Sequence, residues 1–102
     1  MAESIILKDY INYNTGSVVS KTLKQNPAGS ITLFAFDAGQ GLSEHSAPYD
    51  AVVQVIDGEG QFIIGGDEHV LKDGELIIMP ANVPHAVNAR QKFKMMLIML
   101  KA

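Results

Sequence analysis

Two glycine-bounded stretches determine how this sequence is interpreted. The first, Gly39–Gly58, reads GQGLSEHSAPYDAVVQVIDG, and the second, Gly74–Asn88, reads GELIIMPANVPHAVN. Each contains a run of aliphatic and β-branched residues, which is typical of a β-strand, and each carries one histidine, His45 or His85. The connection between the two stretches has room for only two short strands and their turns. We therefore predict a β structure that brings both histidines into one pocket.

The composition indicates a single all-β domain. A chain of 102 residues has no room for a second domain, and a hydrophobic content of 47% suffices for a buried core. Nine glycines and four prolines, spread along the chain, favour many short segments over long helices. The absence of cysteine excludes disulfides, zinc–thiolate sites and thiol nucleophiles. The net charge of −3 argues against nucleic-acid binding, which needs a concentrated basic surface.

The sequence also predicts a cytoplasmic protein. The beginning, MAESIILKDY, has an acidic residue where a secretory signal peptide would be basic. No apolar run approaches the roughly 18 residues that are needed to span a bilayer. We therefore expect no membrane association.

The expected elements follow from turn residues and from the alternation of apolar positions. A short helical turn near residues 8–11 is favoured, although a strand is an open alternative for 3–13. Residues 1–29 are expected to form an N-terminal arm and first strand of the same domain, and residues 30–102 the barrel. Strands are expected at 18–23, 30–37, 42–56 (one strand, or a bent pair broken at Pro48), 61–64, 68–71, 76–79 (buried), 85–89 and 92–100. Residues 57–60, DGEG, are predicted to form a turn.

Alternation along residues 42–56 predicts which side chains face the barrel interior. In a regular strand, successive side chains point to opposite faces. One face carries most of the polar residues, and the other carries His45, Ala47, Tyr49, Ala51, Val53 and Val55. The expected ligand pocket therefore comprises His45, Ala47, Tyr49 and Ala51, together with His85.

The last expected strand has two faces of different character. Phe93, Met95, Leu97 and Met99 form an apolar face that is suited to the core. The other face begins with Lys92 and Lys94, which we expect to be solvated, and ends with Met96, Ile98 and Leu100. This apolar end needs a cover, which a second sheet or a partner subunit can supply, and we predict a homodimer. The methionines at 79, 95, 96 and 99 are interpreted as core filling or as an adaptable pocket wall.

The spacing of these residues resembles that of the cupin family. Its first motif runs G, five residues, H, one residue, H, three or four residues, E, six residues, G. Its second motif runs G, five residues, P, one residue, G, two residues, H, three residues, N. The motif positions that this chain keeps are Gly39, His45, Gly58, Gly74, Pro80 and His85. Asn82 stands at the second glycine of the second motif, and Ala89 at its asparagine.

The resemblance covers roughly residues 30–100 and implies a small single-domain barrel. The expected fold is a jelly roll, or double-stranded β-helix, of two packed antiparallel sheets with a pocket inside, often as a dimer. In many cupins, two histidines and a glutamate of the first motif join the histidine of the second on a metal ion. Ala47 stands at the second histidine position of this chain and Ala51 at the glutamate position.

The departures from the motif favour a binding protein over an enzyme. His45 and His85 remain as metal ligands of an incomplete set, to which Tyr49 or Asp50 could contribute. We expect at most a weakly bound Mn, Fe, Ni or Zn ion. The predicted function is a small-molecule-binding barrel with a degenerate metal site and an unidentified ligand. The alternatives are a metal-dependent oxygenase or isomerase that uses His45 and His85, and a protein-interaction role for the last strand; catalysis stays an open question.

Overall fold

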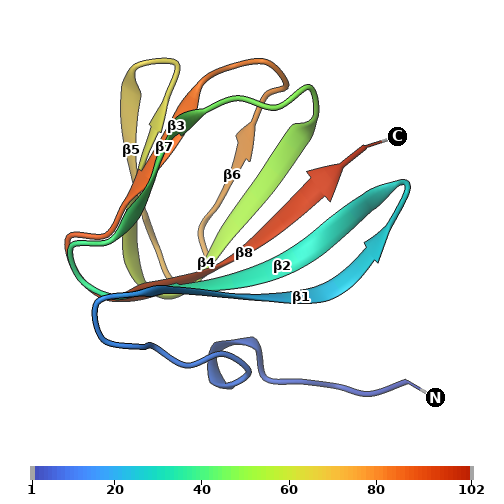
Figure 1. Cartoon of the computed structure of the whole chain (residues 1–102), viewed down its shortest axis with the longest axis vertical. Coiled ribbons are helices and arrows are strands. Elements are labelled where there is room, and N and C mark those ends of the chain that lie inside the picture. The colour runs from blue at the N-terminus through green and yellow to red at the C-terminus, as the bar shows by residue number, and fades with distance from the viewer. Residues whose placement is uncertain (1, 102) are drawn as a thin grey trace.

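The computed structural model describes residues 2–101 and is built almost entirely of antiparallel strands (Figure 1). One turn of 3-10 helix, η1 (Leu7–Asp9), lies in the N-terminal arm, close to the predicted helical turn. The strands are β1 (Val18–Asn26), β2 (Gly29–Phe36), β3 (Gly41–His45), β4 (Asp50–Ile64), β5 (Asp67–Lys72), β6 (Leu76–Met79), β7 (His85–Asn88) and β8 (Phe93–Leu100). Within the described residues, no helix is long and apolar enough to cross a membrane.

The strands form two sheets that share β4. Sheet A has the order β1-β2-β8-β4-β6, and sheet B has the order β3-β7-β4-β5. The first half of β4 pairs with β6 and β8, and its second half pairs with β5 and β7. Figure 1 shows the two sheets curling toward each other around a common interior. This arrangement confirms the predicted double-stranded β-helix of packed antiparallel sheets.

The predicted turn at residues 57–60 is wrong, because β4 continues through this segment without ending. A register shift between Val55 and Asp57 marks a bulge, and Gly58 has a φ of +79°. A bulge bends a strand and increases its twist without ending it, and glycine adopts the positive φ at no steric cost. The glycines of this segment therefore allow β4 to pass from one sheet into the other, where the sequence pattern alone predicts a turn.

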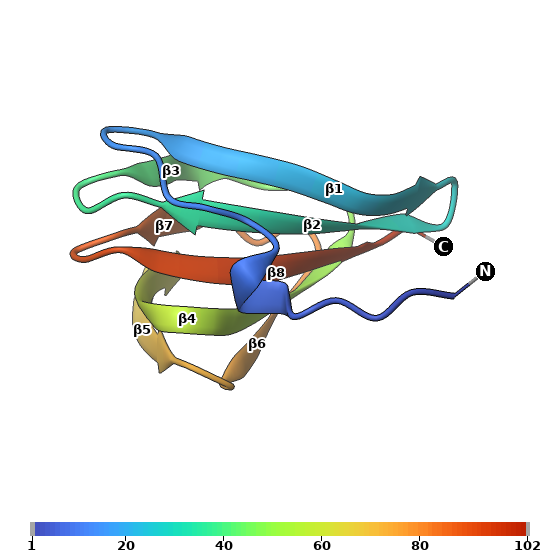
Figure 2. The ribbon, with the colours of Figure 1, turned by 90° about the horizontal axis from the view of Figure 1, so that it is seen from below.

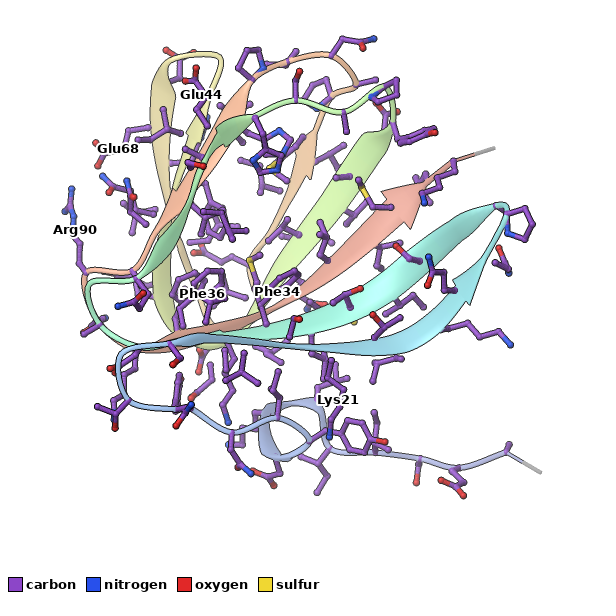
Figure 3. The ribbon with its side chains drawn as sticks, viewed as in Figure 1. Lys21, Phe34, Phe36, Glu44, Glu68 and Arg90 are labelled. Atoms are coloured by element: carbon purple, nitrogen blue, oxygen red, sulfur yellow. The ribbon has the colours of Figure 1, made fainter. Side chains whose placement is uncertain are left out.

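The core lies between the two sheets and is organised around stacked aromatic rings. The ring centroids of Phe36 and Phe93 are 4.7 Å apart with nearly parallel planes, and Phe62 meets Phe93 edge-on at 6.0 Å. Figure 3 shows Phe34 and Phe36 pointing from β2 into the space between the sheets. Phe93, Met95 and the rest of the predicted apolar face of β8 join this cluster, as alternation along the strand predicts.

The N-terminal arm, residues 2–17, covers part of the outer face of sheet A. Ile11 is only 2% exposed and packs against the buried side chains of Leu33 and Ala35 on β2. The arm crosses in front of β2 and β8 in Figure 2, which shows the molecule from below. Lys21 on β1 donates a hydrogen bond of 3.0 Å to the backbone oxygen of Tyr10 and lies over its ring (Figure 3). At Leu33 and Ala35 both faces of β2 are thus covered, and the arm supplies the second cover.

The arm also buries Lys94, which the sequence pattern places on a solvated face. Its side chain is 8% exposed, donates to the backbone oxygen of Lys8, and lies 4.8 Å from the ring centroid of Tyr13. The Tyr13 hydroxyl donates a 2.7 Å hydrogen bond to Asp57 on β4. Burial and this hydrogen bond raise the pKa of Tyr13, so the hydroxyl remains a donor. A backbone carbonyl and an aromatic face replace the water that the lysine was expected to contact.

An apolar row crosses the part of sheet A that the arm leaves open. Cross-strand neighbours in this outer apolar row are Ile31 on β2, Ile98 on β8, Val52 on β4 and Ile78 on β6. Ile78 is 57% exposed, and Leu76 beside the row is 54% exposed, so the prediction of a fully buried strand at 76–79 is wrong. The edge strand β6 buries only its inner face because none of residues 2–101 covers Leu76 and Ile78 on its outer face.

We expect Gly58→Ala to destabilise the fold by about 2 kcal/mol or more, because left-handed backbone is strained in alanine and its Cβ would lie 2.5 Å from the Lys92 oxygen. Gly66→Ala is the matched control, since Gly66 also has a positive φ but meets nothing within 4 Å. The control should lose only about 1 kcal/mol. Urea unfolding of both variants measures the difference, and equal losses would contradict a role for close packing at the bend.

We expect the chain to form a dimer through the outer apolar row, as exposed contiguous apolar surface favours association. Light scattering after size exclusion should give about twice the chain mass of 11.0 kDa. Ile98→Lys should shift the mass toward the monomer, because it places a charge in the middle of the row. Val70→Lys on β5 is the control and should leave the mass unchanged, as Val70 is exposed on the other sheet. A wild-type mass of one chain would contradict the expectation.

Candidate functional site

Neighbouring strands of sheet B bring His45 and His85 together. His45 ends β3, His85 begins β7, and the two are direct cross-strand partners. Their Nε2 atoms lie 3.1 Å apart, and their rings meet at an interplanar angle of 70°. Leu42 and His45 are three residues apart, so in a regular strand their side chains would point to opposite faces. A register shift between them allows both Leu42 and His45 to face the interior. The two predicted histidines therefore do meet in one place.

Two loops that are joined to each other hold the histidines in position. The backbone N–H of Asn82 donates to the oxygen of Ala47, and the N–H of Ala81 donates to Oδ1 of Asp50, both at 2.8 Å. Asn82 adopts a left-handed φ of +65°, which asparagine tolerates better than most residues. The loop before His85 is thus fastened to the loop after His45.

The two imidazole rings make three contacts through their nitrogens, and each of these contacts needs one hydrogen to be a hydrogen bond. His45 Nδ1 lies 2.8 Å from the Ser43 oxygen, and His85 Nδ1 lies 3.2 Å from the Val83 oxygen. Because a carbonyl oxygen can only accept, each Nδ1 must carry a hydrogen for its contact to be favourable. The Nε2–Nε2 contact requires a third hydrogen, whereas two neutral imidazoles have only two. The neutral pair therefore presents acceptor nitrogens to each other with no hydrogen between them.

The environment favours the neutral form of His85. Its side chain is 7% exposed, and burial lowers its pKa below the ordinary value of 6.5; the Val83 hydrogen bond opposes this shift, and the neighbouring His45 adds to it. His85 is thus neutral at pH 7 and turns an unprotonated Nε2 toward His45. His45 is exposed and forms the solvent side of the pair. The pair can accept a hydrogen-bond donor or a cation at these nitrogens.

The pair borders an apolar cavity of about 40 Å³ between the sheets. The lining residues are Leu42, His45, Ala51, Met79, His85, Val87, Met95, Leu97 and Met99. Of the predicted pocket residues, His45, Ala51 and His85 line this cavity, and Ala47 and Tyr49 do not. Tyr49 is 36% exposed, and Lys101 Nζ lies 5.7 Å from its ring centroid. Strand pairing stops at His45 and resumes at Asp50, so alternation does not extend across the intervening loop.

Three of the four methionines that the sequence suggested as core filling or as a pocket wall do border the cavity. Met79, Met95 and Met99 border the cavity, whereas Met96 packs under the N-terminal arm. Met79 and Met99 are the cross-strand partners of Ala51 on its two sides. Their clustering in the sequence suggested a pocket wall, but only the pairing of β6, β4 and β8 places them beside the histidines.

The residues at the site do not fit a divalent metal centre of the kind that the family resemblance implies. Residues 2–101 contain no group of three or more histidine, cysteine, aspartate or glutamate side chains that could hold a metal ion. Asp50 is engaged with the Ala81 N–H, and Ala51 presents a methyl group to the cavity. Mn, Fe, Ni and Zn sites usually draw three or more nitrogen, oxygen or thiolate ligands from the protein, and here only two imidazoles are in place.

Comparison with known proteins identifies the family. The sequence profile of the Cupin domain family matches residues 32–101, and the chain belongs to this family. A conserved protein of unknown function from Streptococcus pyogenes is 32% identical in sequence, with a TM-score of 0.94 over 100% of this chain and 90% of that one. A cupin superfamily protein from Desulfitobacterium hafniense is 25% identical, with a TM-score of 0.93 over 100% and 94% of the two chains.

A third structure is a cupin 2 conserved barrel domain protein from Leptotrichia buccalis. It is 42% identical with a TM-score of 0.90 over 93% of this chain, which spans only 46% of that protein. No curated protein matches the chain.

We expect the stability of the fold to decrease as the pH falls below about 6.5, the pKa of an unperturbed histidine. The lowered pKa of His85 means that the unfolded chain binds its proton at a higher pH than the folded chain does, so acid favours unfolding. Urea unfolding at pH 7.5 and pH 5 measures this loss. His85→Gln should reduce the pH dependence relative to wild type, and an unchanged dependence would contradict the assignment.

Proposed function

We propose that this cupin is a small-molecule-binding barrel whose ligand contacts the His45–His85 pair. The observation that carries the proposal is the 3.1 Å approach of two Nε2 atoms at the wall of an apolar cavity. Because the neutral pair lacks a hydrogen between these nitrogens, a ligand hydroxyl, amine or protonated acid can donate one. The ligand thereby satisfies an acceptor that the protein itself leaves unmatched.

The shape of the site limits which part of a ligand enters. A cavity of about 40 Å³ holds a small group and not a whole organic molecule. The methionine side chains that line it are unbranched and flexible, so they can rearrange around an apolar substituent. The exposed ring of His45 gives the ligand access from solvent. We infer a ligand with one polar hydrogen next to a small apolar group.

The composition of the cavity wall supports binding over catalysis. Among the residues that line it, His45 and His85 are the only titratable side chains. A nucleophile with an adjacent base, or an acid and a base at separate positions, would need further polar groups in the wall. The rest of the lining is aliphatic or thioether.

A metal-dependent oxygenase or isomerase is the second candidate, and one distance favours it. Two nitrogens 3.1 Å apart can both reach one ion at metal–nitrogen bond lengths of about 2.0–2.1 Å. Water or substrate would have to supply the remaining ligands, so Mn, Fe, Ni or Zn would be held weakly. Stoichiometric metal retained by untagged protein through dialysis would favour this candidate over the binding barrel.

We expect His45→Ala with His85→Ala to abolish binding of ethanol, used as a probe with one hydroxyl next to a small apolar group. NMR shifts of the methionine methyl groups during titration measure binding, since three methionines line the cavity. His69→Ala is the matched control, because His69 is exposed on β5 and remote from the pair in the register of sheet B. Unfolding curves establish that each variant is folded. Unchanged ethanol-induced shifts in the double variant would contradict the proposal.

A further inference from the structure

The strands β1 and β2 place apolar side chains on the outer face of sheet A and hydroxyl groups on its inner face. On the outer face, Leu33 and Ala35 of β2 form a small second core with Ile11 of the arm. Successive side chains of a strand alternate between its faces, so the intervening residues face the barrel interior. These inner residues, which we call the hydroxyl patch, are Ser20 and Thr22 of β1 and Ser30 and Thr32 of β2. Because the second core stabilises both strands from outside, their inner face does not have to be apolar.

The register of sheet A places the hydroxyl patch beside the cavity. Thr22 and Thr32 are direct cross-strand partners. On the other side of β2, the partner of Thr32 is Leu97 of β8, and the partner of Ser30 is Met99. Leu97 and Met99 both line the cavity. Direct neighbours on one face have Cβ atoms about 4.5–5.5 Å apart, so the patch begins one strand away from the cavity wall.

The two sheets are not joined to each other at the edge beside the hydroxyl patch. In the strand order β1-β2-β8-β4-β7-β3, β1 and β3 stand at opposite ends. A molecule between these two edges meets the patch on one side and His45, the last residue of β3, on the other. Ser20 and Thr22 are exposed although they lie on the inner face, and Ser30 and Thr32 are half-buried. The interior is therefore open to solvent here, and the mouth of a β-barrel is a preferred place for a ligand.

We propose that the hydroxyl patch is the second half of the ligand site, and that the ligand is an uncharged polyhydroxylated ring, such as a sugar or a cyclic polyol. The inference deepens the proposed function by naming a ligand class, and it rests on the His45–His85 pair being one point of contact. The cavity of about 40 Å³ admits only a small group, so the rest of the ligand lies outside it. The patch borders that space, and each of its hydroxyls both donates and accepts hydrogen bonds.

The buried ring of His85 is independent support for a ligand that carries hydroxyl groups. Its side chain is 7% exposed, and its Nε2 lies 3.1 Å from Nε2 of His45 with no hydrogen between the neutral rings. A buried acceptor that lacks a donor costs free energy, and a ligand hydroxyl removes this cost. A molecule with several hydroxyls donates one to the histidine pair while the others reach the patch.

The side chains around the hydroxyl patch favour an uncharged ligand. Lys21 and Lys24 are the charged residues of β1 and occupy outer-face positions, and β2 has no charged residue. A charged ligand would leave water without meeting an opposite charge, which is costly. Phe34, also on the inner face, is half-buried and points into the space between the sheets (Figure 3). Its ring offers apolar surface to the C–H face of a ring whose hydroxyls contact the patch.

The test is a titration of the full chain with methyl α-D-glucopyranoside and with myo-inositol, two uncharged polyhydroxylated rings, followed by the NMR signals of the threonine and methionine methyl groups. We expect the Thr22 and Thr32 signals to shift, and gluconate, which is charged, to shift them less. Thr22→Val with Thr32→Val replaces each hydroxyl by a methyl group of similar size. It should weaken binding of the two probes about tenfold or more, because two hydrogen bonds are lost. The methionine signals report binding in this variant.

Thr15→Val is the matched control, because Thr15 is exposed in the turn before β1. It should bind both probes as wild type does. Unchanged binding of the probes by the Thr22→Val, Thr32→Val protein, or absence of threonine shifts in wild type, would overturn the inference.

Ethanol binding separates this inference from the proposed function, because ethanol needs only the cavity and the histidine pair. Both wild type and the Thr22→Val, Thr32→Val protein should bind ethanol equally, which also establishes that the variant is folded. Ethanol binding without binding of either polyol would overturn the inference and leave the proposed function intact. Polyol binding that persists unchanged in the His45→Ala, His85→Ala protein would overturn both, because the proposed ligand reaches from the patch to the pair.

Discussion

The bend of β4 at Gly58 is the constraint on which the rest of the structure depends. A single strand of 15 residues pairs with β6 and β8 before the bend and with β5 and β7 after it. The positive φ of Gly58 allows the change of direction, and Gly60 lets the ring of Phe93 pack directly against the backbone. Both sheets therefore include the same continuous strand. The path of β4 fixes how the two sheets face each other and so where the cavity between them lies.

The site follows from how the two sheets face each other across this interior. Sheet B contributes the imidazole pair, and sheet A contributes Ala51 and the methionines. The scaffold is that of a cupin, but the cavity is lined by two histidines, three methionines and aliphatic side chains, and no carboxylate borders it. A site that lacks carboxylates has no anion to offset a divalent charge. This difference in donor chemistry, and not a difference in fold, separates the chain from the metal-binding pattern that its motif resembles.

The outer face of sheet A divides into a covered and an uncovered part. The N-terminal arm covers one part: Ile11 packs on β2, Tyr13 donates to Asp57 of β4, and Lys94 of β8 donates to the backbone oxygen of Lys8. A lysine can be buried there because a carbonyl oxygen and an aromatic face stabilise its charge. The outer apolar row lies beyond the reach of the arm, on strands that pack well on their inner side only.

The sequence by itself determined the fold class, most strand positions and the two histidines. Glycine spacing and alternation are local properties, and they were sufficient to predict an all-β domain, the apolar face of β8 and the loop that delivers His85. The barrel of two packed sheets was implied by the resemblance to the cupin motifs. The predictions failed where backbone geometry depends on partners. Residues 57–60 have turn composition but form a bulge within β4, because strands on both sides continue the pairing. Lys94 has a polar side chain but is buried by an arm that is distant in sequence.

Only the tertiary structure decided what surrounds the histidines. Alternation placed Tyr49 in the pocket, but the chain leaves the sheet after His45 and turns that side chain outward. The 3.1 Å contact between the Nε2 atoms depends on the register of β3 against β7, and the methionines meet Ala51 only through the register of β6 and β8 against β4. Register between strands distant in sequence is fixed by packing across the whole barrel. For that reason the sequence determined that the two histidines and the methionines are present, and the fold decided that they line one cavity.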